Sequence, residues 1–306
     1  MRLVESPHYR DENLAFNNIY LRPLYEPLPE HIASLVEDIR KDCDSSGLSL
    51  DQIKQDTGLN ELWRGERSET DIKEYLKMNF FPFPSQQDVL RRSNDIPMYQ
   101  HTVPSIRSDY KVSNPIPDTL FGYKSYITFL QQQKELSSLG HERNANSEAL
   151  LFPFLIIEYK TDNTGSLKVA TNQCLGASAS CINTTERLNQ QLRQCESSEL
   201  PLVNSAVFSI ATNGSEVRLH ISWKYDELKY YMAHVSSFVL QDPEQYLKFY
   251  KYVQNIMNWG RTKRLEQIRE SLGKLGKGKT LKRRASEVSD DSASSGDHKR
   301  KVSRKT

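Results

Sequence analysis

The stretch LLFPFLIIEYK, Leu150–Lys160, is the most apolar run of the 306-residue chain. A continuous apolar run of this length predicts a β-strand that is buried on both faces. The run ends on Glu158 and Lys160, whose charges resist burial. Because side chains alternate along a strand, Glu158 and Lys160 are expected to project together from one face at the strand end.

The segments around this strand predict an α/β core. Their patterns indicate, in chain order, a short strand at 118–126, a helix at 128–140, the buried strand, a long amphipathic helix at 167–195, a hairpin at 206–223, a strand at 230–240 and a helix at 242–257. We therefore expect the core to extend from about Pro115 to Trp223, with helices on both sides. In the long helix, Cys174, Cys181 and Leu188 are expected to be buried against the sheet.

The chain divides into three predicted parts. Residues 1–105 are expected to form a mostly helical extension packed on the core, with helices at 28–40, 49–62 and 68–81. Residues 106–273 form the core domain and its C-terminal helices. Residues 274–306 form a tail that we expect to be disordered, because it is rich in Ser, Lys and Gly and holds no aromatic residue.

The tail carries a net charge of +7, which leaves −5 on residues 1–273, since the whole chain carries +2. Its basic clusters Lys282–Arg284 and Lys299–Lys301 resemble a bipartite nuclear-localisation signal, which predicts a nuclear protein that binds an import receptor. A solvated run of charges is the alternative interpretation. The sequence has no apolar run of about 20 residues and no apolar segment near Met1, so neither a membrane span nor secretion is expected.

The four cysteines predict no metal site, since none of them forms a CxxC pair. A carboxylate pair is the better candidate. If Asp118, on the strand before, points to the same place as Glu158, two carboxylates and Lys160 converge. Two neighbouring carboxylates repel each other unless a cation lies between them, and oxygen ligands suit Mg²⁺ or Mn²⁺. This combination is suited to hydrolysis of a phosphodiester.

At these residues the chain resembles the PD-(D/E)xK nuclease superfamily, through Pro117-Asp118 and Glu158-Tyr159-Lys160. Gln173 lies where many members carry a glutamine on the following helix. The resemblance implies a restriction-endonuclease-like αβββαβ core. It also implies that Asp118 and Glu158 ligate Mg²⁺ or Mn²⁺, that Lys160 positions a water, and that Gln173 supports the site.

A longer resemblance covers roughly Tyr9 to Leu272. The chain is similar to a fungal domain-of-unknown-function family described as PD-(D/E)xK nuclease-like. The segments that carry the similarity are YRDENLAFNNIYL, PIPDTLFGY, FPFLIIEYK, ATNQCLGASASCINTTERLN, FSIATNGSEVRLHISW and VQNIMNWGRTKRLEQI. This family implies the fold more firmly than an activity, because its substrate is not established, and DNA and RNA both remain open.

Two alternatives stay open. The nuclease-like fold can instead serve as a catalytically inactive module that binds nucleic acid or protein, which the acidic charge of residues 1–273 favours. Asp118 can simply cap a turn, and Glu158 and Lys160 can mark the edge of the core. Convergence of the three beneath a groove lined by Lys or Arg would favour the nuclease. The resemblance to the superfamily also implies an acidic residue from the first helix, for which Glu37 or Asp38 is the candidate.

Overall fold

The computed structural model describes residues 3–42, 47–65, 68–104, 109–161, 166–194 and 202–276. Its strands are β1 Ile19–Leu21, β2 Leu90–Ser93, β3 Thr119–Tyr123, β4 Leu151–Tyr159, β5 Val207–Thr212, β6 Glu216–Lys224 and β7 Tyr230–Val239. Its α-helices are α1 Glu30–Arg40, α2 Leu50–Lys54, α3 Thr57–Trp63, α4 Glu69–Asn79, α5 Gln133–Ser138, α6 Leu167–Arg193 and α7 Pro243–Trp259. The mixed α/β fold is confirmed.

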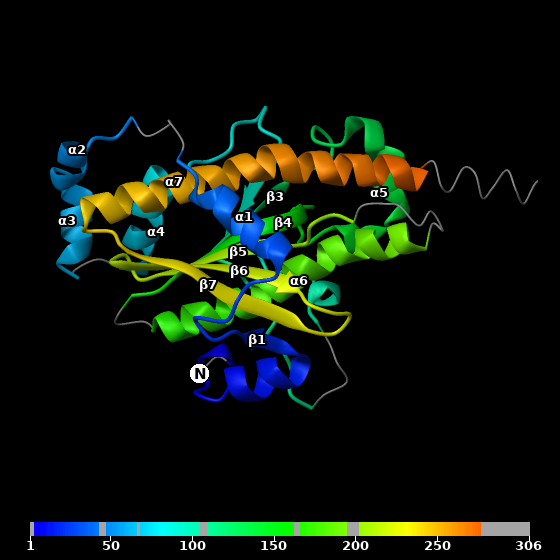
Figure 1. The fold of residues 1–306 in the computed structure, drawn as a ribbon, viewed down its shortest axis with the longest axis horizontal. Coiled ribbons are helices and arrows are strands. Elements are labelled where there is room, and N and C mark those ends of the chain that lie inside the picture. The colour runs from blue at the N-terminus through cyan, green and yellow to red at the C-terminus, as the bar shows by residue number, and fades with distance from the viewer. Residues whose placement is uncertain are drawn as a thin grey trace, which may run out of the picture.

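Within the described residues, these strands form one seven-stranded mixed sheet in the order β1-β7-β6-β5-β4-β3-β2. Helix α6 covers one face of the sheet, and α7 with α1 covers the other (Figure 1). A π-helical turn at Gly260–Arg264 and a helix at 265–276 continue α7. The sheet is therefore the middle layer of three, with an apolar core on each side.

Strand β4 lies inside the sheet, as its sequence predicts. All nine of its residues are buried. Leu155 and Ile157 belong to the core beneath α7, whereas Ile156 belongs to the core beneath α6. By the same alternation, Glu158 and Lys160 project on the α6 face of the sheet.

Strand pairing brings the functional candidates to one end of the sheet. β3 pairs antiparallel with β4, and β4 pairs parallel with β5. Helix α6 makes the crossover between the two parallel strands, so it lies over the end of β4. The predicted hairpin of β5 and β6 is confirmed, and Gly214 adopts φ 88° in its turn.

Helix α6 extends as one element, and the predicted burial of Cys174, Cys181 and Leu188 is confirmed. Cys174 lies against β5, where its Sγ is 3.6 Å from the Ile210 carbonyl oxygen. Cys195, which the prediction included in this helix, and the tail beyond residue 276 lie outside the described residues.

The structure differs from the sequence prediction in three elements. Residues 49–62 form two helices rather than one, because Asp56 caps a new helix by accepting from the Leu59 N–H. The helix expected at 128–140 is confined to α5 with a 3₁₀ turn before it. The segment expected to be a mostly helical extension also contributes β1 and β2, which form the two edges of the sheet.

None of the helices in the described residues combines the length and the apolarity that crossing a membrane requires.

Candidate functional site

Asp118 and Glu158 are brought together by the register of β3 and β4. Thr119 lies opposite Ile157 in this antiparallel pair. Asp118 precedes Thr119 and Glu158 follows Ile157, so the two carboxylates extend the same ladder by one step. Directly opposite residues share a face and place their Cβ atoms about 5 Å apart. Two residues 40 positions apart in the sequence thus become neighbours at the end of the sheet.

The Asp118 carboxylate is held by two donors. Its Oδ2 accepts from the Tyr159 backbone N–H at 2.9 Å, and its Oδ1 lies 3.5 Å from Lys73 Nζ on α4. Lys73 also forms an ion pair with Asp95. The bond to Tyr159 ties Asp118 to β4, next to Glu158, so the position of the carboxylate is fixed by the backbone.

Glu158 is almost completely buried, with 1% of its surface exposed. Burial raises the pKa of Glu158 well above its usual range, the Asp118 carboxylate raises it further, and Lys160 opposes both. Glu158 Oε2 is buried without a hydrogen-bond partner among the described residues. A buried carboxylate oxygen without a partner costs free energy, unless a ligand or a proton satisfies it.

Lys160 lies beside the two carboxylates and is also mostly buried, with 8% of its surface exposed. Its Nζ donates to the Tyr159 carbonyl oxygen at 2.7 Å and lies 3.7 Å from the carboxylate of Glu69. Glu69 is in the first turn of α4. The lysine head is therefore held between the end of β4 and the start of α4.

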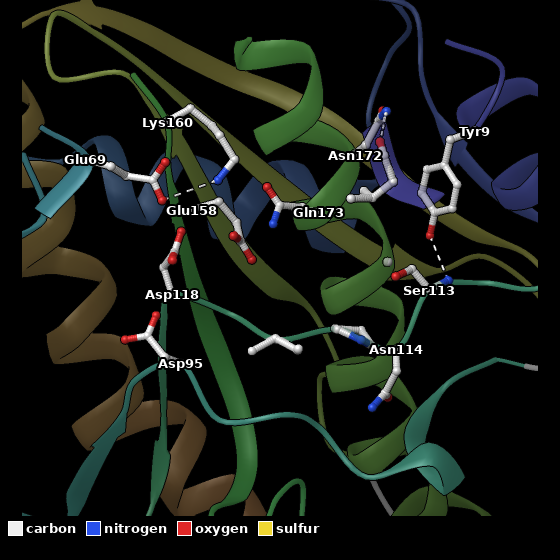
Figure 2. Close-up of a pocket in the computed structure, with 14 residues that line it drawn as sticks. Tyr9, Glu69, Asp95, Ser113, Asn114, Asp118, Glu158, Lys160, Asn172 and Gln173 are labelled. Atoms are coloured by element: carbon white, nitrogen blue, oxygen red, sulfur yellow. Dashed lines mark hydrogen bonds and ion pairs between the residues drawn. The ribbon is translucent and has the colours of Figure 1, made fainter. Parts of the chain in front are cut away.

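Gln173 reaches the same place from α6. Its Oε1 is buried without a hydrogen-bond partner among the described residues. Figure 2 shows the Gln173 amide pointing toward Glu158 and Lys160, with Asp118 below Glu158 on the side away from Gln173. The structure thus brings together all four residues that the sequence singles out, from β3, β4 and α6.

These residues line one part of a cavity of about 420 Å³. The other part is lined by Tyr9 and Asn172, among others. The Tyr9 hydroxyl accepts from the Ser113 N–H at 3.0 Å, and Arg10 Nε donates to Asn172 Oδ1 at 2.8 Å. The N-terminal segment, held by these two bonds, therefore forms part of the cavity wall on this side (Figure 2).

The donor set fits a hard divalent cation in part. Within the described ranges, no three His, Cys, Asp or Glu side chains are grouped so that they could hold a metal ion. Mg²⁺ needs only one or two carboxylates, because it keeps several waters and takes further oxygens from its substrate. Asp118 and Glu158 supply that pair. The unpartnered oxygens of Glu158 and Gln173 are the buried groups that such a cation or its waters would satisfy.

Glu37 and Asp38 do not join the site. Glu37 forms an ion pair with Arg40, and Asp38 forms ion pairs with Lys41 and Lys263. Both residues are on α1, which packs with α7 on the face of the sheet away from α6 (Figure 1). The position of α1 explains why the two residues do not reach the site. The buried face of α1 is directed toward α7, and Glu37 and Asp38 lie off that face.

Sequence reasoning missed three charged residues around the site: Glu69, Lys73 and Asp95. Glu69 follows the helix cap Ser68, where an acidic residue normally complements the helix dipole. Its sequence context therefore gives no signal of a role at a distant strand end. Lys73 follows Glu69 by four residues, so both lie on the same face of α4. This spacing is common on exposed helices, and only the packing of α4 against the end of the sheet shows that the face is directed toward the site.

The charge lining the cavity is mixed rather than basic. Four carboxylates are among the described residues that line the cavity, whereas Lys160 is the only lysine or arginine in that lining. The three key residues do converge, but they do not lie beneath a lining of Lys and Arg.

No curated protein was found to match this chain. A family model described as domain of unknown function DUF7924 matches residues 64–272. This match begins just before α4 and ends in the helix at 265–276, so it includes Asp118, Glu158, Lys160 and Gln173. The chain therefore belongs to the DUF7924 family.

Proposed function

We propose that this protein is a divalent-metal-dependent nuclease that hydrolyses phosphodiester bonds of DNA or RNA. The observation that carries the proposal is the pairing of Asp118 with Glu158 at the ends of β3 and β4, with Lys160 beside them. Two carboxylates forced together in a buried place are unfavourable without a cation. A divalent cation bound between the two carboxylates would offset this repulsion.

The order of elements supports placing the chain in the PD-(D/E)xK superfamily, with a restriction-endonuclease-like core. In chain order, α4, β2, β3, β4, α6 and β5 give αβββαβ, with the short helix α5 as an insertion before β4. Asp118 is at the start of the second of these strands and the Glu-x-Lys triplet is at the end of the third. A fungal origin, which the sequence resemblance implies, belongs to the same proposal.

Asp118 and Glu158 are the residues that would hold Mg²⁺ or Mn²⁺, with Gln173 Oε1 nearby to support the site. When bound, a divalent cation lowers the pKa of water and offsets the charge that develops on a phosphate. Glu158 must be ionised to serve as a ligand, and the charge of Lys160 favours that form. The N–H of Tyr159 keeps Asp118 oriented toward the same point.

Lys160 carries the proposed chemistry at the reacting phosphate. Its ammonium is held by the Tyr159 carbonyl and by Glu69, so it is preorganised at the site. From there it can orient the attacking water and stabilise negative charge on the phosphate oxygens. Glu69 acts through Lys160 and is a positioning residue.

A catalytically inactive binding module is the second candidate, and one observation favours it. The cavity lining holds Glu69 and Asp95 in addition to Asp118 and Glu158, which disfavours a polyanion close to the pair. In that case the same site would bind a cation or a protein partner without cleavage.

A metal titration separates the two candidates. Labelled single- and double-stranded DNA and RNA are incubated with the protein in EDTA, Mg²⁺ or Mn²⁺, and the products are separated on a denaturing gel. The nuclease produces cleavage of at least one substrate in Mg²⁺ or Mn²⁺ and none in EDTA. No cleavage of any substrate under any condition supports the binding module.

The basic clusters of the tail lead to a proposal on localisation. Lys282–Arg284 and Lys299–Lys301 would bind a nuclear-import receptor and bring the protein to the nucleus. A fluorescent fusion lacking residues 281–306 should then lose nuclear enrichment that the full chain shows. If both fusions distribute equally, the clusters serve another purpose.

A further inference from the structure

One stripe of α4 leads away from the carboxylate pair. Glu69, Lys73 and Lys77 follow one another at intervals of four residues, so they lie on one face of the helix. Glu69 contacts Lys160, and Lys73 contacts Asp118. Lys77 is the next position along this stripe, about 12 Å from Glu69 along the helix axis. The stripe therefore extends from the site to the far end of α4.

Positive charge gathers at the end of this stripe, where Lys77 lies within the field of Arg92. In the part of the chain that the structure describes, Lys77 and Arg92 have no salt bridge to a carboxylate, and Arg92 donates Nη1 to the Phe81 carbonyl. Burial lowers the pKa of Lys77, the charges of Lys73 and Arg92 lower it further, and Asp95 and Asp118 oppose them. Lys73 is paired with Asp95 and Asp118, so Lys77 and Arg92 are the two neighbouring cations without a carboxylate partner among the described residues, and a bound anion would reduce their repulsion.

An exposed aromatic ring lies beside these cations. Phe83 is 66% exposed, and the guanidinium carbon of Arg92 lies over its ring, 4.0 Å from the ring centroid. Arg92 thus covers one face of the ring and leaves the ring accessible to solvent. An apolar ring held by an arginine at the surface gives a stacking platform of the kind that binds unpaired nucleic-acid bases.

We infer that Lys77, Arg92 and Phe83, which we call the α4–β2 strip, bind a single-stranded segment of nucleic acid at the other end of the α4 stripe from the carboxylate pair. Lys77 contacts a backbone phosphate and a base stacks on Phe83. Arg92 positions the Phe83 ring, and its charge adds to the electrostatic attraction of the phosphates. The inference deepens the proposed function and rests on it in one respect: only the nuclease requires the bound nucleic-acid strand to continue from the α4–β2 strip toward Asp118. It also provides the basic surface that the cavity lining lacks.

The occupant follows from the chemistry of the strip. A base paired inside a duplex presents no free face to Phe83, whereas an unpaired base does. The cations select a polyanion, and the ring selects a planar apolar group attached to it. A single strand has both features at adjacent positions, so we expect tighter binding of single strands than of duplexes.

The test is fluorescence anisotropy of the full-length protein with a labelled 15-nucleotide oligo-dT or oligo-U, in EDTA and at several salt concentrations. Phe83→Ala should weaken binding at least about fivefold, since stacking of one base is worth about 1–3 kcal/mol, and the salt dependence should not change. Lys77→Gln should reduce the slope of log affinity against log salt by about 0.7. Phe83→Trp should keep the affinity and show tryptophan quenching on binding.

Matched controls come from the rest of the surface. Tyr25 is 95% exposed and follows β1, at the opposite edge of the sheet from β2. Lys54 is an exposed lysine of α2 that pairs with Asp51. Tyr25→Ala and Lys54→Gln should bind the oligonucleotides as the wild type does.

Because EDTA prevents cleavage, this test separates the strip from the nuclease activity. A protein that binds through Lys77 and Phe83 but cleaves nothing in Mg²⁺ or Mn²⁺ contradicts the nuclease and supports the strip. A protein that cleaves, while Phe83→Ala and Lys77→Gln bind as the wild type does, contradicts the strip alone. Failure of the wild type to bind either oligonucleotide, or binding of duplex that is tighter than that of single strands, also overturns the strip.

Discussion

The Asp118 carboxylate accepts a hydrogen bond from the backbone N–H of Tyr159, the residue between Glu158 and Lys160. One backbone bond therefore ties the first carboxylate to the strand that carries the other two residues of the site. It also fixes two negative groups next to each other, which adds to the effect of burial in raising the pKa of Glu158. The main chain of β3 and β4, rather than flexible side chains, sets the spacing of the two carboxylates, so their repulsion does not move them apart in the folded protein.

Replacing Asp118 with asparagine should weaken metal binding and leave the fold intact. Asparagine keeps the volume and can still accept from the Tyr159 N–H, but it loses the negative charge. Since changes around ligands already cost about 10–100-fold in affinity, we expect a loss of more than about tenfold for Mg²⁺ or Mn²⁺. The measurement is the rise of the melting temperature on titration with each metal.

The control for this prediction is Asp95→Asn. Asp95 also lines the cavity, but its side chain is 58% exposed and it pairs with Lys73. This variant should keep the metal-induced rise in melting temperature. Equal responses of wild type and Asp118→Asn to metal would show that Asp118 is not a ligand.

Replacing Lys160 with methionine should abolish turnover while metal binding is retained, because an ammonium is not a metal ligand. We expect cleavage to fall at least about 100-fold, the lower range for loss of a group that stabilises charge developing in the transition state. The rate is measured under single-turnover conditions and the metal affinity by calorimetry. Lys168→Met, an exposed change at the start of α6, serves as the control. A Lys160→Met protein that cleaves normally would remove lysine from the mechanism.

Cys174 and Cys181 should react slowly with thiol reagents in the native protein. Both are buried, and burial raises the pKa of each thiol. Only the thiolate reacts, so alkylation has to wait for opening of the structure. The experiment uses a chain in which Cys43 and Cys195 are replaced by serine, and mass spectrometry follows labelling with and without urea. Rapid labelling of both thiols without urea would contradict the position of α6.

Stability should fall in acid because of His220. This residue is 3% exposed and lies opposite His234 across β6 and β7. Burial, together with the charge of His234, lowers the pKa of His220 from 6.5 to about 3. Between these values the unfolded chain binds a proton that the folded protein does not, so the free energy of unfolding decreases as the pH falls from about 6.5 toward 3.

The variant that tests this is His220→Leu, which removes the titrating group and keeps an apolar side chain on β6. Urea unfolding at pH 7.5, 6.0 and 5.0 should give a clear loss of stability for the wild type and a smaller one for the variant. Identical pH dependence of the two proteins would show that His220 titrates normally in the folded state.

The central strands were predictable because they consist mainly of apolar residues, which indicate burial. β4 is apolar from Leu151 to Ile157, and β5 and β6 are separated by Asn213-Gly214, a typical turn. The edge strands gave no such signal. β1 has three residues, and β2 reads LRRS, with charged side chains of the kind that edge strands carry. Asp56 interrupts a helical pattern without changing its spacing, so two helices appeared as one.

The candidate site was predictable only where the chemistry lies within one strand. The Glu-x-Lys spacing places Glu158 and Lys160 on one face, whatever the rest of the fold. The place of Asp118 depends on the register of β3 with β4, which the sequence suggests through resemblance alone. Glu69 and Lys73 come from α4, and their approach depends on the packing of that helix against the sheet end. Pairwise patterns in the sequence do not encode such packing.

The most direct test of the central claim is a crystal of the protein soaked in Mn²⁺, with diffraction data collected at a wavelength where manganese scatters anomalously. The account predicts an anomalous peak between the carboxylates of Asp118 and Glu158, at ligand distances of about 2.1 Å from an oxygen of each. The same peak should disappear from crystals of Asp118→Asn. A well-ordered crystal without a peak at this position, or with its peak at Glu69 and Asp95 instead, would contradict the assignment of the metal site.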